Sequence, residues 1–110
     1  MKIKPRNGPV VYVASAFSGD IEANIKKAKE YGRFVVSQGA SPINPILNLT
    51  DVISEETERE LALSIDLALL DRADEIWMFG PLTEGMVIEL NEAAEQEILI
   101  RMFSENMEEL

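Results

Sequence analysis

One glutamate stands in an apolar stretch of the sequence, where its side chain could do chemistry. Glu89 lies within MVIEL, residues 86–90, and follows Gly85 by four positions, about one helical turn. Helical periodicity places Glu89 at the margin of the apolar face, next to Ala93. The pattern alone favours a half-exposed glutamate, and the competing interpretation is a working carboxylate that points into a cleft.

A second carboxylate, Asp66, interrupts LALSIDLALL, residues 61–70, where the apolar residues predict heavy burial. A buried carboxylate needs a partner, or its pKa rises because burial disfavours the charged form. Arg59 stands seven positions earlier on the same helical face and is the candidate partner. A structural ion pair and a role in a site therefore both stay open for Asp66.

The end of the first expected strand and the loop after it carry hydroxyl groups and backbone N–H groups that could bind a ligand. Tyr12 lies near the end of the first strand, where its phenol either packs in the core or reaches the mouth of a site. The loop after it can hold phosphate or ribose hydroxyls on backbone N–H groups, although it is neither a GxGxxG nor a Walker loop. The loop residues assigned to substrate binding are Ser15, Ala16, Phe17, Ser18 and Gly19.

The start of a later helix offers a second place for an anion or a hydroxyl. Thr83 can cap this helix, and Gly85 either exposes backbone N–H groups to a ligand or only packs against a strand. We assign Thr83, Glu84, Gly85 and Met86 to substrate binding, with the Glu84 side chain itself solvated.

Composition excludes several kinds of chemistry. The 110 residues include no histidine and no cysteine, which excludes disulfides, thiolate chemistry and imidazole triads, and no calcium-loop spacing is present. A carboxylate-only magnesium or calcium site stays open, but we assign no metal ligand and expect no cofactor. The net charge of −10 opposes binding to nucleic-acid polymers or anionic lipid, and favours a small-molecule or protein partner. No apolar run approaches the roughly 18 residues of a membrane span, and without an export signal we expect a cytoplasmic protein.

Strand and helix patterns alternate along the chain. Expected strands are 9–17, ending near Ala14, then a proline-broken edge strand within 40–47 followed by an irregular loop, then 75–80 and 98–103; expected helices are 20–39, 54–74 and 83–97. The alternation predicts an α/β fold, a small doubly wound flavodoxin- or Rossmann-like parallel sheet of four to five strands with helices on both faces. The helix from Ser54 should be well buried over 61–70.

We divide the chain into a flexible lead-in, 1–8, a single domain, 9–103, and an acidic tail, 104–110, which is expected to fray. In doubly wound folds, ligands bind beyond the carboxyl ends of the strands. This rule places three segments at one mouth: ASAFSGD, residues 14–20; NPILNLTD, residues 44–51; and GPLTEGM, residues 80–86.

Four motifs together carry a resemblance to a known family. They are YVAS, NIKKAKEYGRF, LALLDRADEIWMFG and TEGMVIE, within residues 10–94. In these motifs the chain resembles the nucleoside 2-deoxyribosyltransferases, the related 2′-deoxynucleoside 5′-monophosphate N-glycosidases and, most of all, small bacterial and phage proteins near that family. The resemblance implies that Glu89 is the nucleophile, that Asp66 handles a proton at the leaving base, that Tyr12 orients Glu89 and that Asn44 lines the pocket.

The function implied is transfer or hydrolysis of the N-glycosidic bond of a nucleoside or deoxynucleotide, in a homo-oligomer of two or more chains. The alternatives are a non-catalytic nucleotide-binding or sensing module, and a phage or mobile-element accessory protein that acts through protein interaction. Phe17 and Ser18 stand where the monophosphate hydrolases carry basic and glycine-rich residues, which places phosphate binding in question.

Overall fold

The apolar runs of the sequence form a four-stranded sheet in the computed structural model, which describes residues 1–110. The strands are β1 (Val10–Ala14), β2 (Ser41–Ile43), β3 (Glu75–Phe79) and β4 (Leu99–Phe103). Their order is β2-β1-β3-β4 and every pair is parallel. The predicted parallel sheet is confirmed, with four strands.

Four helices connect or flank these strands: α1 (Ile21–Ser37), α2 (Pro45–Leu49), α3 (Arg59–Leu70) and α4 (Glu84–Glu95). Side chains cap two of them, because Asp20 accepts a hydrogen bond from the Ala23 amide and Thr83 accepts one from the Met86 amide. The helices predicted to follow the first and third strands are therefore present, with the caps expected from the sequence.

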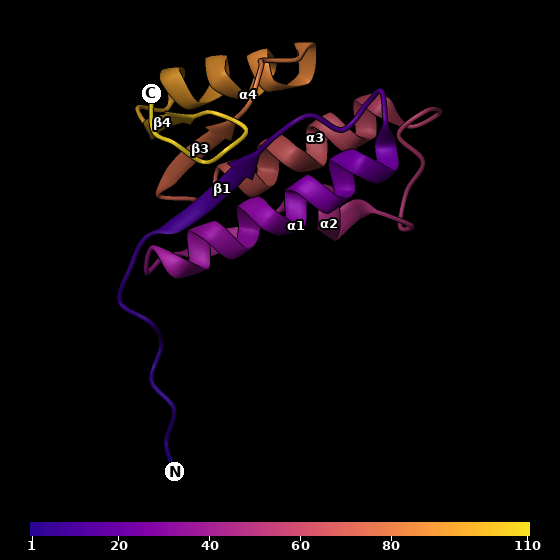
Figure 1. The fold of residues 1–110 in the computed structure, drawn as a ribbon. Coiled ribbons are helices and arrows are strands. Elements are labelled where there is room, and N and C mark those ends of the chain that lie inside the picture. Colours follow the sequence, from indigo (N-terminus) through magenta and orange to yellow (C-terminus); the bar gives the residue numbers. More distant parts are fainter.

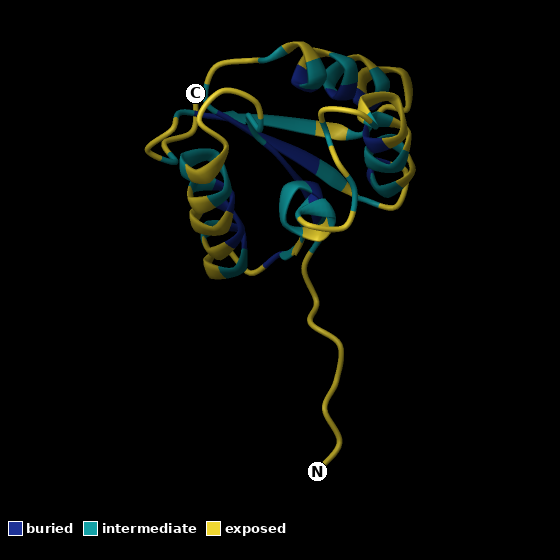
Figure 2. Cartoon of the chain, turned by 90° about the vertical axis from the view of Figure 1, so that its right-hand side faces the viewer, coloured by how far each residue is buried: buried dark blue, intermediate teal, exposed yellow.

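The helices cover both faces of the sheet (Figures 1 and 2). The crossover from β1 to β2 runs in the direction opposite to the crossovers from β2 to β3 and from β3 to β4. Right-handed connections therefore place α1 on one face and α3 and α4 on the other. Each face has its own core, one around Val35 of α1 and one around Met86 and Ala93 of α4. The predicted doubly wound, flavodoxin-like fold is confirmed.

Two local predictions were wrong in the segment before α3. The helix begins at Arg59 and not near Ser54, because residues 54–58 form a turn in which the Glu58 side chain and amide bond back to Ser54. The loop predicted after the edge strand contains α2, which Pro45 starts at the first helical position.

The helix α3 is less buried than its composition predicts. Only Ala62 and Leu70 are fully buried in it, and Leu61 is 47% exposed. The helix packs on the sheet through Leu67 and Leu70 and lies beside α2 and α4. Its apolar residues therefore lie partly in solvent.

The last residues do not fray, contrary to our expectation. The Leu110 amide donates to the Met102 carbonyl, and Glu109 pairs with Phe103 in an antiparallel bridge. Met107 packs on the core of the α1 face. On this face α1 is the one helix, and it leaves the sheet uncovered near β4. The tail is held because it supplies apolar cover that the sheet otherwise lacks on this side.

The first residues extend away from the body in Figure 2 and contain no helix or strand. Arg6 nevertheless contacts the body, since its guanidinium donates to the carbonyls of Val36 and Ala40 near the end of α1. No helix in the structure combines the length and apolar character that a membrane crossing requires.

Candidate functional site

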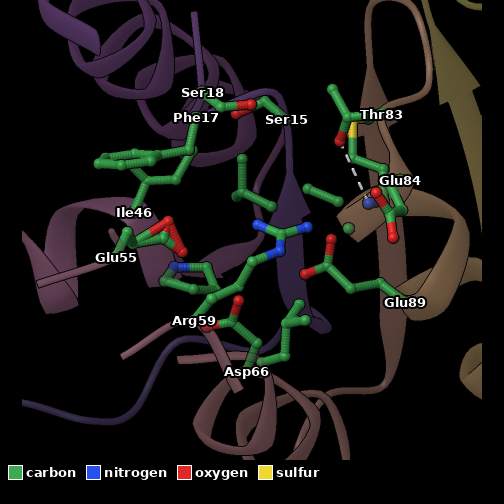
Figure 3. Close-up of a pocket in the computed structure, with 16 residues that line it drawn as sticks. Ser15, Phe17, Ser18, Ile46, Glu55, Arg59, Asp66, Thr83, Glu84 and Glu89 are labelled. Atoms are coloured by element: carbon green, nitrogen blue, oxygen red, sulfur yellow. Dashed lines mark hydrogen bonds between the residues drawn. The ribbon is translucent and has the colours of Figure 1, made fainter. Parts of the chain in front are cut away.

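The sheet order reverses direction between β1 and β3, and a cavity of about 230 Å³ lies at the carboxyl ends of these two strands. Such a switch point opens a crevice because the connections leave neighbouring strands in opposite directions. The walls come from the loop after β1, the start of α2, the start of α3 and the start of α4 (Figure 3). Polar side chains from three of these segments, together with apolar ones from the start of α2, therefore face one space.

Glu89 is buried, with only 7% of its surface exposed, and it lines this cavity. The Tyr12 hydroxyl, itself fully buried on β1, donates a hydrogen bond to Glu89 Oε2. The half-exposed glutamate favoured by periodicity is therefore wrong. The reason is tertiary, because Met86 and Ala93 anchor α4 in the core and turn the neighbouring Glu89 over the end of β1.

Burial raises the pKa of Glu89 to about 7, against an ordinary value of 4.5. The Tyr12 hydrogen bond opposes this rise, and the charges of Asp66 and Glu55 add to it. Burial also raises the pKa of Tyr12 well above its ordinary value, with a further contribution from the Glu89 charge. Tyr12 therefore stays a hydrogen-bond donor, and Glu89 exchanges a proton near neutral pH.

Asp66 reaches the same cavity from α3. Burial, followed by the charge of Glu55, raises its pKa to about 7. Its Oδ1 atom is buried and has no hydrogen-bond partner. The proposed ion pair with Arg59 is absent, although Arg59 lines the same cavity. An unpaired buried oxygen is costly, so a ligand donor would stabilise this site.

The loop after β1 contributes only part of the predicted set. Ser15, Phe17 and Ser18 line the cavity, whereas Ala16 and Gly19 do not. Ala16 lines a separate small cavity, which Ser15 also lines. Gly19 has φ +99°, a conformation that glycine adopts without strain, so it turns the chain into α1.

A side chain of α1 holds this loop in place. The Asn24 amide donates to the carbonyl of Phe17 at 3.0 Å and to that of Ser18 at 2.9 Å. Asn24 opens one of the recognised motifs, NIKKAKEYGRF, but its role in positioning the loop was not predicted.

The start of α4 lines the cavity through all four predicted residues, Thr83, Glu84, Gly85 and Met86. A side chain at Gly85 would begin 3.7 Å from Arg59 Nη2 and from Leu63 Cδ2, which is ordinary contact distance. Close packing therefore does not require glycine here. What the missing side chain provides is an open wall beside the first amides of the helix.

Asn44 does not line the cavity, contrary to our expectation. Its side-chain amide donates to the Ala28 carbonyl at 2.8 Å, and Gly32 leaves the space in which it lies. Asn44 thus joins the start of α2 to α1, and its role is structural.

Sequence reasoning missed Glu55 as a cavity residue and placed Arg59 only as a partner of Asp66. Both were expected to lie in one helix with Asp66. The turn at 54–58 instead carries Glu55 across the mouth, and no sequence pattern indicates this path. No group of three acidic side chains is close enough together to hold a metal ion.

Residues 9–103 match the protein family described as a domain of unknown function, DUF7768. The chain belongs to this family. The match covers the whole sheet, from β1 to the end of β4, and all four helices.

Among solved structures, the chain is similar to a 2-deoxyribosyltransferase from the psychrotolerant bacterium Bacillus psychrosaccharolyticus, an enzyme described as a biocatalyst for the synthesis of nucleosides. The two are 21% identical, with a TM-score of 0.67 over 86% of this chain and 72% of that one. This similarity shows a shared fold. A comparison with curated proteins finds no match.

Proposed function

We propose that this protein breaks the N-glycosidic bond of a nucleoside or deoxynucleotide, with Glu89 as the nucleophile, and passes the sugar to water or to a second base. One observation carries the proposal: a buried Glu89 is held by the Tyr12 hydroxyl in the same cavity as Asp66, at the switch point of the sheet. The fold shared with a 2-deoxyribosyltransferase supports it.

The chemistry requires two carboxyl groups in different protonation states. An ionised Glu89 attacks the anomeric carbon, so that a C–O ester bond forms while the C–N bond breaks. The electron pair of the C–N bond moves to the base, and a protonated Asp66 donates its proton there. Water or a second base then attacks the same carbon, Glu89 leaves, and the Asp66 carboxylate takes up the proton that the attacking group releases.

The electrostatics of the cavity support this division of roles. Burial raises the pKa values of both Glu89 and Asp66 to about 7, and the charge of Glu55 adds to the rise at each, so near neutral pH the two groups together hold about one proton. The Tyr12 hydrogen bond favours the charge on Glu89, while the unpartnered oxygen of Asp66 favours a proton on that residue. The reactive arrangement is therefore the stable one, and activity should follow a bell-shaped pH profile centred near 7.

The test is an incubation with deoxynucleosides and their 5′-monophosphates, in which free base is followed by chromatography. Glu89→Gln should release base at least about a thousandfold more slowly than the wild type, because an amide is not a nucleophile. Glu95→Gln is the matched control on the same helix, since Glu95 is exposed and lines no cavity described here.

Each outcome has a separate meaning. The absence of release from every substrate by the wild type would refute the enzyme, and binding without turnover would instead favour a nucleotide-binding module. Equal rates for the wild type and Glu89→Gln would refute the role of Glu89.

A further inference from the structure

A second cavity, of about 220 Å³, lies beside the first, between α1, α2 and the segment 50–58. The two share Phe17, Pro45, Ile46, Glu55 and Asp66, so they adjoin each other. Apolar side chains make most of the second wall, including Ile21 and Ile25 of α1 and Leu49 of α2. A cavity of this kind suits a flat, mostly apolar ring system with a polar edge.

The two proposed reacting groups, Glu89 and Asp66, are placed differently relative to the two cavities. Glu89 lines only the first cavity, whereas Asp66 lines both. In Figure 3, Phe17, Ile46 and Glu55 lie on one side of the Arg59 guanidinium, and Glu89 lies on the other. A base that is displaced by Glu89 leaves on the side opposite the attack and must meet the proton of Asp66 there. The second cavity, which Asp66 reaches and Glu89 does not, is the space on that side.

The polar edge of this second cavity is formed by hydrogen-bond acceptors. Glu55 stands at the junction and makes no side-chain hydrogen bond or ion pair, and no lysine or arginine lines the second cavity. Thr50 also lines it, but its hydroxyl already donates to the Ile46 carbonyl. The free partners for a ligand are thus the carboxylates Glu55 and Asp51, together with Asp66.

We propose that the second cavity holds the nucleobase of the substrate and that Glu55 selects bases with an exocyclic amino group. This inference rests on the proposed function. An ionised carboxylate accepts a hydrogen bond from the amino group of adenine or cytosine, and it repels the carbonyl oxygen at the same place in hypoxanthine or uracil. A hydrogen bond to a charged group discriminates by about tenfold to a hundredfold.

The experiment uses two matched substrate pairs, deoxyadenosine with deoxyinosine and deoxycytidine with deoxyuridine. The kcat/KM for base release is measured for the wild type, for Glu55→Gln and for Glu56→Gln. The last variant is the control, because Glu56 neighbours Glu55, carries the same charge, is exposed and lines no cavity described here.

The decisive quantity is the amino-to-oxo ratio of kcat/KM within each pair, compared between proteins. Differences in leaving-group chemistry between the two bases of a pair cancel in this comparison. Glu55→Gln should lower the ratio about tenfold or more, since an amide also donates a hydrogen bond to the oxo group. Glu56→Gln should keep the wild-type ratio.

The results separate this inference from the proposed function. A ratio unchanged in Glu55→Gln, while the wild type releases base, would overturn the role of Glu55 and leave the enzyme standing. A wild type that releases no base from any of the four substrates would overturn both. Thermal unfolding of each variant establishes that the proteins compared are folded.

Discussion

The two faces of the sheet bury polar and aromatic groups in opposite ways. On the face covered by α3 and α4, Tyr12 donates to a buried Glu89, and Asp66 has an oxygen without any partner. On the face covered by α1, Tyr31 stacks on Phe79 with ring centroids 4.5 Å apart. Two ion pairs lie at the surface of this face, Lys27 with Glu105 and Arg101 with Glu109.

The contrast indicates that one face mainly stabilises the fold and that the other carries the candidate site. Stacked rings and surface ion pairs stabilise the fold, because apolar area is buried and no charge loses its hydration without a partner. Uncompensated carboxylates in a cavity destabilise it, and proteins retain such groups where they bind or react. We therefore expect substitutions on the α1 face to change stability, and substitutions on the α3 and α4 face to change activity and pH dependence.

The largest effect on stability should come from Phe79→Ala. Phe79 is buried, stacks on Tyr31 and on Phe103 and meets the edge of Phe34, so the change leaves a cavity in the aromatic core. We expect a loss of about 3–5 kcal/mol in the free energy of unfolding, measured by urea denaturation.

Phe17→Ala is the matched control, since Phe17 lies at the cavities and is only partly buried. It should cost less stability than Phe79→Ala and weaken substrate binding instead. Equal losses of stability in the two variants would remove the contrast between the faces.

The next largest effect on stability should come from Glu89→Gln. Most substitutions of a buried residue lower the free energy of unfolding, but this one should raise it at alkaline pH. The pKa of Glu89 rises from 4.5 to about 7 on folding, so between these values the folded chain keeps a proton that the unfolded chain has lost. Wild-type stability therefore falls as the pH increases from about 4.5 to about 7, and glutamine avoids this loss. The free energy of unfolding of the variant, relative to that of the wild type, should be roughly 1–3 kcal/mol higher at pH 8 than at pH 4.

Thermal unfolding of both proteins across this pH range measures the effect. The difference in Tm between variant and wild type should widen with pH, and Glu95→Gln should show no such trend. A difference that stays constant from pH 4 to pH 8 would contradict the raised pKa of Glu89.

The smallest effect should come from Glu109→Gln. The Arg101 guanidinium bonds to Glu109 at 2.8 and 2.6 Å and lowers its pKa, and both side chains are partly in solvent. The stabilisation of such a pair exists above the ordinary carboxyl pKa and disappears as the pH falls through the lowered value. We expect a decrease in Tm of about 2 °C or less at pH 7, which high salt or acid removes. A larger decrease would show that the tail holds the α1 face together.

The sequence by itself determined the fold to a useful depth. Alternating strand and helix patterns, the caps Asp20 and Thr83 and the proline-broken edge strand predicted the doubly wound sheet, and all are present. The rule for strand ends also predicted which loops meet at one mouth. These features depend on local periodicity and chain connectivity, which a sequence displays directly.

Only the tertiary structure decided the burial of Glu89, the position of Glu55 and the course of the tail. Periodicity places Glu89 relative to its own helix, but its burial depends on Tyr12, which stands 77 residues away in the chain. Glu55 reaches the cavities because residues 54–58 turn instead of joining α3, and the tail folds back because one side of the sheet lacks a helix. Contacts between distant segments set these outcomes, and no local pattern records them.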